Sequence, residues 1–110
     1  MTHGLRSFII VLMRLTPQAI AIIRQTVRAE LGDGAQVRLF GSRTDDAARG
    51  GDVDLHVLAD VTVDNPVWTA ALLSARLQRL DGRAVDVRLL VLGMQRQPID
   101  EVALAEGVLL

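Results

Sequence analysis

The sequence has no cysteine, no lysine and no long hydrophobic run, and each absence narrows what the protein can be. Without cysteine, the chain can form no disulfide and offers no thiolate ligand to a metal. The apolar run at residues 8–13 (FIIVLM) would span about 9 Å as a helix, whereas the hydrocarbon core of a bilayer is about 30 Å thick. Arg14 closes this run and no small-residue cleavage site follows, which argues against a signal peptide. We therefore expect a cytoplasmic protein that has no membrane partner.

Neither positive nor negative charge is in large excess in the sequence. The formal net charge is −1 at pH 7, and the sequence contains no block of like charge. A general nucleic-acid binder needs a basic face that displaces counterions, so we expect no direct general binding of nucleic acid. The 12 basic residues are all arginines, which suit bidentate contacts with phosphate.

Proline, glycine and capping residues divide the chain into helices and strands. A proline at the first helical position predicts three helices, which begin at Pro17, Pro66 and Pro98. Thr16 and Asn65 are suitable N-cap residues for the first two, and Gly32 is typical of the end of the first. Apolar runs predict three strands, at residues 36–40, 52–59 and 84–92. This order predicts an α+β fold in which a small mixed β-sheet is flanked by helices.

The length of 110 residues and the apolar half of the composition predict a single domain. The regular pattern begins at Met13, so we expect the domain to cover residues 13–110. Residues 1–12 are then an N-terminal extension of uncertain role, and Met13 is a candidate for the true start. The alternative is that residues 1–12 add a helix or strand to the sheet.

Three aspartates occur where apolar strand residues would be expected. Asp52 and Asp54 share one face of their strand because side chains alternate along a strand. Asp86 interrupts the run AVDVRLLVL, where an unpaired carboxylate would be costly. Two unit charges 4 Å apart repel by about 4 kcal/mol at an effective dielectric constant of 20, so converging carboxylates need a counter-charge. Oxygen ligands favour Mg²⁺ or Mn²⁺, and Asp52, Asp54 and Asp86 are therefore a predicted metal site.

A glycine-serine turn ends the strand at residues 36–40. Gly41 allows a sharp turn and a close approach of the backbone to a ligand. Backbone amides near Ser42, at the start of a short helix, would form a cradle for phosphate, and the Ser42 hydroxyl would add a donor. Phosphates held there would lie beside a carboxylate-bound metal, as phosphoryl or nucleotidyl transfer requires.

The combined motif is more specific than its parts. Gly41-Ser42, a spacer of nine residues and Asp52-Val53-Asp54-Leu55 resemble the signature of the nucleotidyltransferase superfamily of DNA polymerase β. Together with the VDVRLL strand and the closing PIDEVALAEGVLL, residues 13–110 look like the minimal nucleotidyltransferases (MNT), whose genes usually neighbour one for a HEPN-domain protein.

The resemblance implies roles for particular residues. Gly41 and Ser42 would hold the triphosphate of a nucleotide, Asp52 and Asp54 would bind two Mg²⁺ ions, and Asp86 would complete the site and help to activate the acceptor hydroxyl. It also implies an antitoxin that transfers AMP from ATP to a tyrosine of a HEPN toxin. The core uses most of the chain, so we expect the acceptor site to come largely from a partner.

Two other functions stay open at this point. The first is an antitoxin that neutralises its partner by occlusion, without catalysis. The second is a free-standing transferase that modifies a small molecule. Those enzymes usually carry an additional acceptor-binding domain, which we do not expect in a chain of this length.

Other residues have two interpretations each. Arg43 is a candidate phosphate contact or a solvated loop arginine. His56 lies on the strand face of Asp54, and we expect a partly buried, hydrogen-bonded histidine rather than a contact to nucleotide or metal-bound water. Trp68 shares a helical stripe with Leu72 and is expected to pack internally, with a partner-facing anchor as the alternative.

Overall fold

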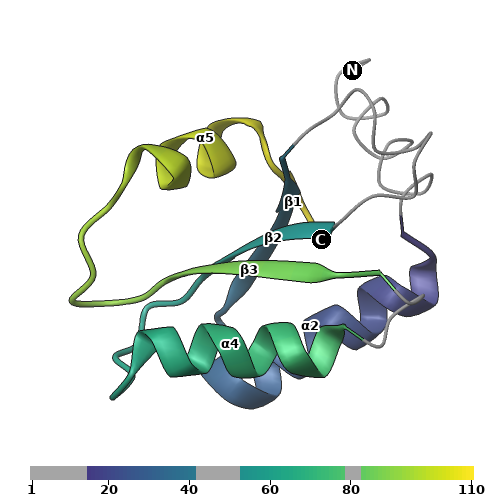
Figure 1. Cartoon of the computed structure of the whole chain (residues 1–110), viewed down its shortest axis with the longest axis horizontal. Coiled ribbons are helices and arrows are strands. Elements are labelled where there is room, and N and C mark those ends of the chain that lie inside the picture. Colours follow the sequence, from purple (N-terminus) through teal and green to yellow (C-terminus); the bar gives the residue numbers. More distant parts are fainter. Residues whose placement is uncertain (1–14, 42–52, 79–82) are drawn as a thin grey trace.

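The computed structural model describes residues 15–41, 53–78 and 83–110, and these form a four-stranded sheet with helices on both faces (Figure 1). The helices are α2 (Pro17–Leu31), α4 (Pro66–Leu77) and α5 (Pro98–Glu106). The strands are β1 (Gln36–Phe40), β2 (Val53–Leu58), β3 (Val85–Leu90) and β4 (Val108–Leu109). The predicted α+β class is confirmed. The proposed extension at residues 1–12 and the domain start at Met13 lie outside the described residues.

The sheet is mixed, as the sequence predicts, and its strand order is β3-β2-β1-β4. Strand β1 pairs antiparallel with β2 and with β4, whereas β2 and β3 run parallel. A parallel pair needs a crossover connection, and α4 provides it. Helices α2 and α4 cover one face of the sheet and α5 lies over the other, with the chain returning beside β1 as β4 (Figure 1).

Local signals explain where the helices begin. The Thr16 hydroxyl accepts a hydrogen bond from the Ala19 amide at 3.0 Å, and the Asn65 side chain accepts one from the Trp68 amide at 3.0 Å. Both caps satisfy amides that the first helical turn leaves without partners. Gly32 ends α2 with a φ of 96°, a conformation that a residue without Cβ adopts readily.

The hydrophobic core lies between the sheet and the α2/α4 layer. Alternation places Leu55 and Val57 of β2 on this face, while Asp54 and His56 face the α5 side. The largest fully buried apolar side chains come from both helices and β2: Ile23, Val27, Leu55, Val57, Leu73 and Leu77. The core therefore stabilises one face of the sheet and leaves the other for polar residues.

Three sequence-based expectations need correction. Strands β2 and β3 end earlier than predicted, at Leu58 and Leu90. Beyond β3, Leu92 already belongs to a turn that Gly93 continues at a φ of 90°. The closing GVLL adds β4, a short strand that the sequence did not predict as such. Trp68 does not pack internally, since its side chain is 64% exposed at the start of α4. None of the helices within the described residues is long and apolar enough to span a bilayer.

Removing a core side chain should destabilise the domain far more than the same change at the surface. Leu55 is fully buried, whereas Leu92 is 51% exposed. We expect Leu55→Ala to lower the free energy of unfolding by about 2–5 kcal/mol, because it removes buried area and leaves a cavity. Leu92→Ala should change it by less than about 0.5 kcal/mol. Denaturant unfolding would measure both, and equal losses would contradict this assignment of the core.

Candidate functional site

Asp54 and Asp86 lie side by side on adjacent parallel strands. They are register partners between β2 and β3, and the strands of a sheet are about 4.8 Å apart. Both side chains are on the face opposite the α2/α4 core, where Asp54 is half-buried and Asp86 is exposed. The structure therefore brings two of the three predicted carboxylates together, in a place that solvent or a ligand can reach.

Gly41 lies directly against this pair. Its neighbour Phe40 is the β1 partner of Asp54 in the antiparallel register, so β1 ends beside the start of β2. Gly41 has a φ of 104°, and a Cβ at this position would collide with Oδ2 of Asp54 and approach its Cβ and Cγ to 3.1 Å. The absence of a side chain is what lets the turn approach the carboxylate so closely.

The other predicted site residues, Ser42, Arg43 and Asp52, lie outside the described residues. Within the described ranges no three His, Cys, Asp or Glu residues form a group able to hold a metal ion, and Asp52 would be the third carboxylate. The two carboxylates that are described fit a hard divalent cation, because they present oxygen ligands from adjacent strands on one face. The roles of all six residues stay predictions.

Contacts from α4 hold the start of β3, where Asp86 lies. The Ser74 hydroxyl donates a hydrogen bond to the carbonyl oxygen of Val85, the residue before Asp86. The Val53 amide donates to the Ala84 carbonyl at 2.9 Å, which extends the pairing of β2 and β3. These bonds fix the ends of the two strands that carry the aspartates.

A buried polar cluster lies on the same sheet face, two residues further along β2 and β3. His56 and Asp100 are fully buried, and Nε2 of His56 lies 2.9 Å from Oδ1 of Asp100. Arg88, the β3 register partner of His56, donates from Nε to Oδ1 at 2.9 Å and from Nη2 to Oδ2 at 2.7 Å. The Gln97 amide donates to Oδ2 at 2.7 Å. The carboxylate of Asp100 thereby joins the first turn of α5 to the parallel strands β2 and β3.

Electrostatics favour the ionised form of Asp100. The hydrogen bonds from Arg88 hold the pKa of Asp100 well below its usual range, and the Gln97 amide and the His56 ring act in the same direction, against the effect of burial. The same hydrogen bonds raise the pKa of Arg88. Because an ionised carboxylate only accepts hydrogen bonds, Nε2 of His56 must carry the hydrogen. Its Nδ1 has no partner among the described residues.

The sequence predicts a partly buried, hydrogen-bonded His56. The ring is hydrogen-bonded to Asp100 as predicted, but it is fully buried rather than partly buried. Phe40 packs on it edge to face, with ring centroids 6.2 Å apart. Arg88 and Asp100 were missed. Arg88 stands two residues after Asp86 and shares its face, which was an available signal, whereas Asp100 resembled an ordinary acid in the first turn of a helix.

Replacing Gly41 should reveal its close approach to Asp54. Gly93 has a similar positive φ of 90°, but a Cβ there would meet nothing within 4 Å. We expect Gly93→Ala to lower the free energy of unfolding by about 1–3 kcal/mol through backbone strain alone. Gly41→Ala should cost roughly 1 kcal/mol more, because its Cβ also displaces Asp54. Equal losses in denaturant unfolding would show that the turn does not press on the carboxylate.

Asp100 should contribute stability that depends on pH. Its folded-state pKa lies below the unfolded value of about 3.9, so its contribution is present above pH 4 and is lost as the pH falls below that value. We expect Asp100→Asn to lower the free energy of unfolding by about 3 kcal/mol at pH 7, because it breaks a buried ion pair. The difference from the unsubstituted protein should narrow between about pH 4 and pH 2.

Glu101→Gln is the matched control for Asp100→Asn. Glu101 is in the same helical turn, but its ion pair with Arg96 joins side chains that are 62% and 57% exposed. We expect this control to change the free energy of unfolding by less than about 1 kcal/mol. A similar loss of unfolding free energy in both variants would show that Asp100 does not anchor α5 to the sheet.

Comparisons with known proteins agree with this geometry. A family model described as a nucleotidyltransferase domain matches residues 20–110, a span that includes Gly41, Asp54 and Asp86. Searches of curated proteins and of solved structures found no match. Because the matched span covers most of the 110 residues, the chain belongs to the nucleotidyltransferase domain family of the DNA polymerase β-like superfamily.

Proposed function

We propose that the protein is a Mg²⁺-dependent nucleotidyltransferase that transfers a nucleoside monophosphate, with AMP from ATP as the first candidate, to a hydroxyl group. The observation that carries the proposal is the register pairing of Asp54 with Asp86 beside the Gly41 turn, within a chain that belongs to the nucleotidyltransferase family. In the transfer, the acceptor oxygen forms a bond to the α-phosphorus of the nucleotide. The bond between the α-phosphorus and the oxygen that bridges the α- and β-phosphates breaks. Pyrophosphate leaves, and the hydroxyl proton passes to solvent.

Each residue of the proposed site has a distinct part. Asp52 and Asp54 would hold divalent cations, which when bound would neutralise the charge of the phosphates and of the attacking and leaving oxygens. Asp86, the more exposed partner of Asp54, would accept a hydrogen bond from the acceptor hydroxyl and orient it. Gly41, Ser42 and Arg43 would bind the phosphates. Asp54 and Gly41 are thus proposed to act from the adjacent ends of the two central strands, β2 and β1.

The acceptor that we propose is a tyrosine hydroxyl of a HEPN-domain toxin, which the protein would neutralise as an antitoxin in the cytoplasm. The surface offers some support for a protein partner. Val67 and Trp68 are 81% and 64% exposed at the start of α4, and tryptophan is often an anchor of protein interfaces. The internal packing first expected for Trp68 therefore gives way to the partner-facing alternative.

Removing either carboxylate should slow transfer strongly without unfolding the protein. We expect Asp54→Asn and Asp86→Asn each to lower the rate by roughly 10²–10³-fold, because the first removes a charged ligand of the metal and the second removes the group that orients the acceptor hydroxyl. Both variants should fold, since each substitution relieves the repulsion between the two acids. The measurements are the mass of a candidate HEPN-domain partner after incubation with Mg-ATP and the thermal unfolding of the variants.

Asp64→Asn is a suitable control, because Asp64 is an exposed residue in the loop before α4. It should leave transfer unchanged. If the partner gains no nucleotide mass with any of the four nucleoside triphosphates, yet is neutralised equally by the protein and by Asp54→Asn, occlusion is the mechanism. Transfer to a small molecule but not to the partner would instead favour a free-standing transferase.

A further inference from the structure

Arg88 lies on the same strand face as Asp86, two residues further along β3. Two residues of a strand span about 7 Å, a distance that a long side chain can bridge. Asp86 is therefore within reach of the Arg88 guanidinium group. Within the described residues, however, Asp86 has neither an ion pair nor a side-chain hydrogen bond. The two opposite charges stay apart although the strand brings them close.

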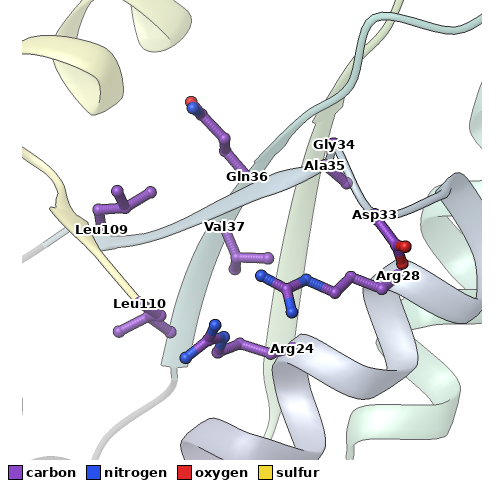
Figure 2. Close-up of a pocket in the computed structure, with 9 residues that line it drawn as sticks. All are labelled: Arg24, Arg28, Asp33, Gly34, Ala35, Gln36, Val37, Leu109 and Leu110. Carbon is purple, nitrogen blue, oxygen red and sulfur yellow. The ribbon is translucent and has the colours of Figure 1, made fainter.

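The guanidinium group of Arg88 is held instead by Asp100 of α5. Nε and Nη2 of Arg88 donate to Oδ1 and Oδ2 of Asp100 at 2.9 and 2.7 Å, so one whole edge of the guanidinium is occupied. Such a two-point contact fixes the orientation of the group as well as its position. By contrast, Arg24 and Arg28 extend from α2 with exposed side chains (Figure 2). Arg88 is thus a restrained cation, turned toward α5 rather than toward Asp86.

Asp100 is itself fixed in place. Its carboxylate is fully buried and also accepts hydrogen bonds from Nε2 of His56 at 2.9 Å and from the Gln97 amide at 2.7 Å. If Arg88 left, the buried carboxylate would lose its counter-charge, which is strongly unfavourable. An ion pair with the exposed Asp86 would not compensate for this loss, because solvent weakens ion pairs at the surface. The folded protein therefore favours the pairing of Arg88 with Asp100.

A guanidinium group beside Asp86 would interfere with the candidate site. Asp54 and Asp86 are adjacent like charges, so they attract any cation that can approach them. The fork of an arginine matches the geometry of a carboxylate and would occupy its oxygens. The positive charge would also repel a divalent cation. An unrestrained Arg88 would thus compete with a metal ion for the paired aspartates.

We propose that Asp100 is a positioning residue of the candidate site, which holds and neutralises Arg88 and so prevents an ion pair between Arg88 and Asp86. The paired aspartates would thereby stay open to a divalent cation. The effect on cation binding rests on the proposed function, whereas the restraint of Arg88 does not. The buried cluster would serve ligand binding as well as the attachment of α5.

The first test uses neither metal nor enzyme activity. Asp86→Asn is introduced into the unsubstituted protein and into Asp100→Asn, and Tm is measured with EDTA present. In the unsubstituted protein Asp86→Asn relieves repulsion with Asp54, so Tm should stay equal or rise. In the Asp100→Asn background it removes the new partner of Arg88, so Tm should fall by roughly 2–4 °C. An effect of the same sign in both backgrounds would overturn the proposal.

Asp100→Asn should be less stable than the unsubstituted protein, so its folding is checked by circular dichroism. If it unfolds in buffer, trimethylamine N-oxide strengthens burial and allows the same comparison of Tm in all variants.

The second test measures the affinity of the full chain for Mn²⁺ by electron paramagnetic resonance of the free ion. Asp100→Asn should weaken binding roughly tenfold, because the released Arg88 repels the cation. The double variant Arg88→Gln/Asp100→Asn should restore binding, since the competing charge is gone and the two amides can hydrogen-bond to each other. A merely structural role of Asp100 predicts no rescue, because the double variant lacks the ion pair as well. Binding as weak in the double variant as in Asp100→Asn would overturn the proposal.

Glu101→Gln is the matched control for both tests. It removes the same charge from the same helical turn, but from an exposed ion pair with Arg96. Mn²⁺ affinity should stay within about twofold of that of the unsubstituted protein, because solvent screens charges at exposed positions. Asp86→Asn should have the same effect on Tm in this background as in the unsubstituted protein.

The two tests separate this proposal from the proposed function. A change in the sign of the Tm effect, without Mn²⁺ binding by the unsubstituted protein, would support the restraint of Arg88 and contradict the metal site. Equal Mn²⁺ binding by the unsubstituted protein and by folded Asp100→Asn would support the metal site and contradict the role of Asp100.

Discussion

The parallel register of β2 with β3 is the constraint on which the site depends. It sets Asp54 beside Asp86 on one face of the sheet, and in the same step it sets their neighbours Leu55 and Val87 on the core face. A shift of the register by one residue would bury the acids and expose the apolar side chains, which the hydrophobic effect opposes. Burial of the core on the α2/α4 face therefore keeps the like-charged Asp54 and Asp86 next to each other on the opposite face of the sheet.

The polar face has its own means of attachment, because the residues of α5 that are buried within the described chain are Asp100 and Ala103. Asp100 supplies it, by accepting hydrogen bonds from Arg88, from His56 and from the Gln97 amide. A buried carboxylate is tolerated only when such donors surround it. The cluster also lies directly next to the paired aspartates along β2 and β3, so the placement of α5 and the geometry of the candidate site share the same two strands.

Much of the fold could be predicted from the sequence because its signals are local. Thr16, Asn65 and the prolines that follow them define helix starts through contacts within one turn. Alternation likewise placed Asp54 and Asp86 on polar faces. The ends of β2 and β3 were less predictable, since apolar residues such as Leu92 continue beyond the last strand residue and only Gly93 marks the turn.

The parts that escaped prediction depend on contacts between residues distant in sequence. His56 and Asp100 are separated by 44 positions, and nothing near either residue indicates that they meet. The exposure of Trp68 was also unpredictable, because a helical stripe shared with Leu72 does not show how the helix is rotated on the sheet. Ser42, Arg43 and Asp52 lie outside the described residues, so their predicted place beside Gly41 and Asp54 stays a prediction.

The strand order has a consequence for how the protein behaves at high concentration. Within the described residues, β3 forms an outer edge of the sheet, where free backbone groups invite pairing with another molecule and hence aggregation. Asp86 and Arg88 place charges on this edge strand, and such charges oppose the addition of a foreign strand. The Asp86 carboxylate, which lies in the candidate site, thus also opposes aggregation through the edge strand. A substitution of Asp86 would therefore change both the candidate site and the solubility of the protein.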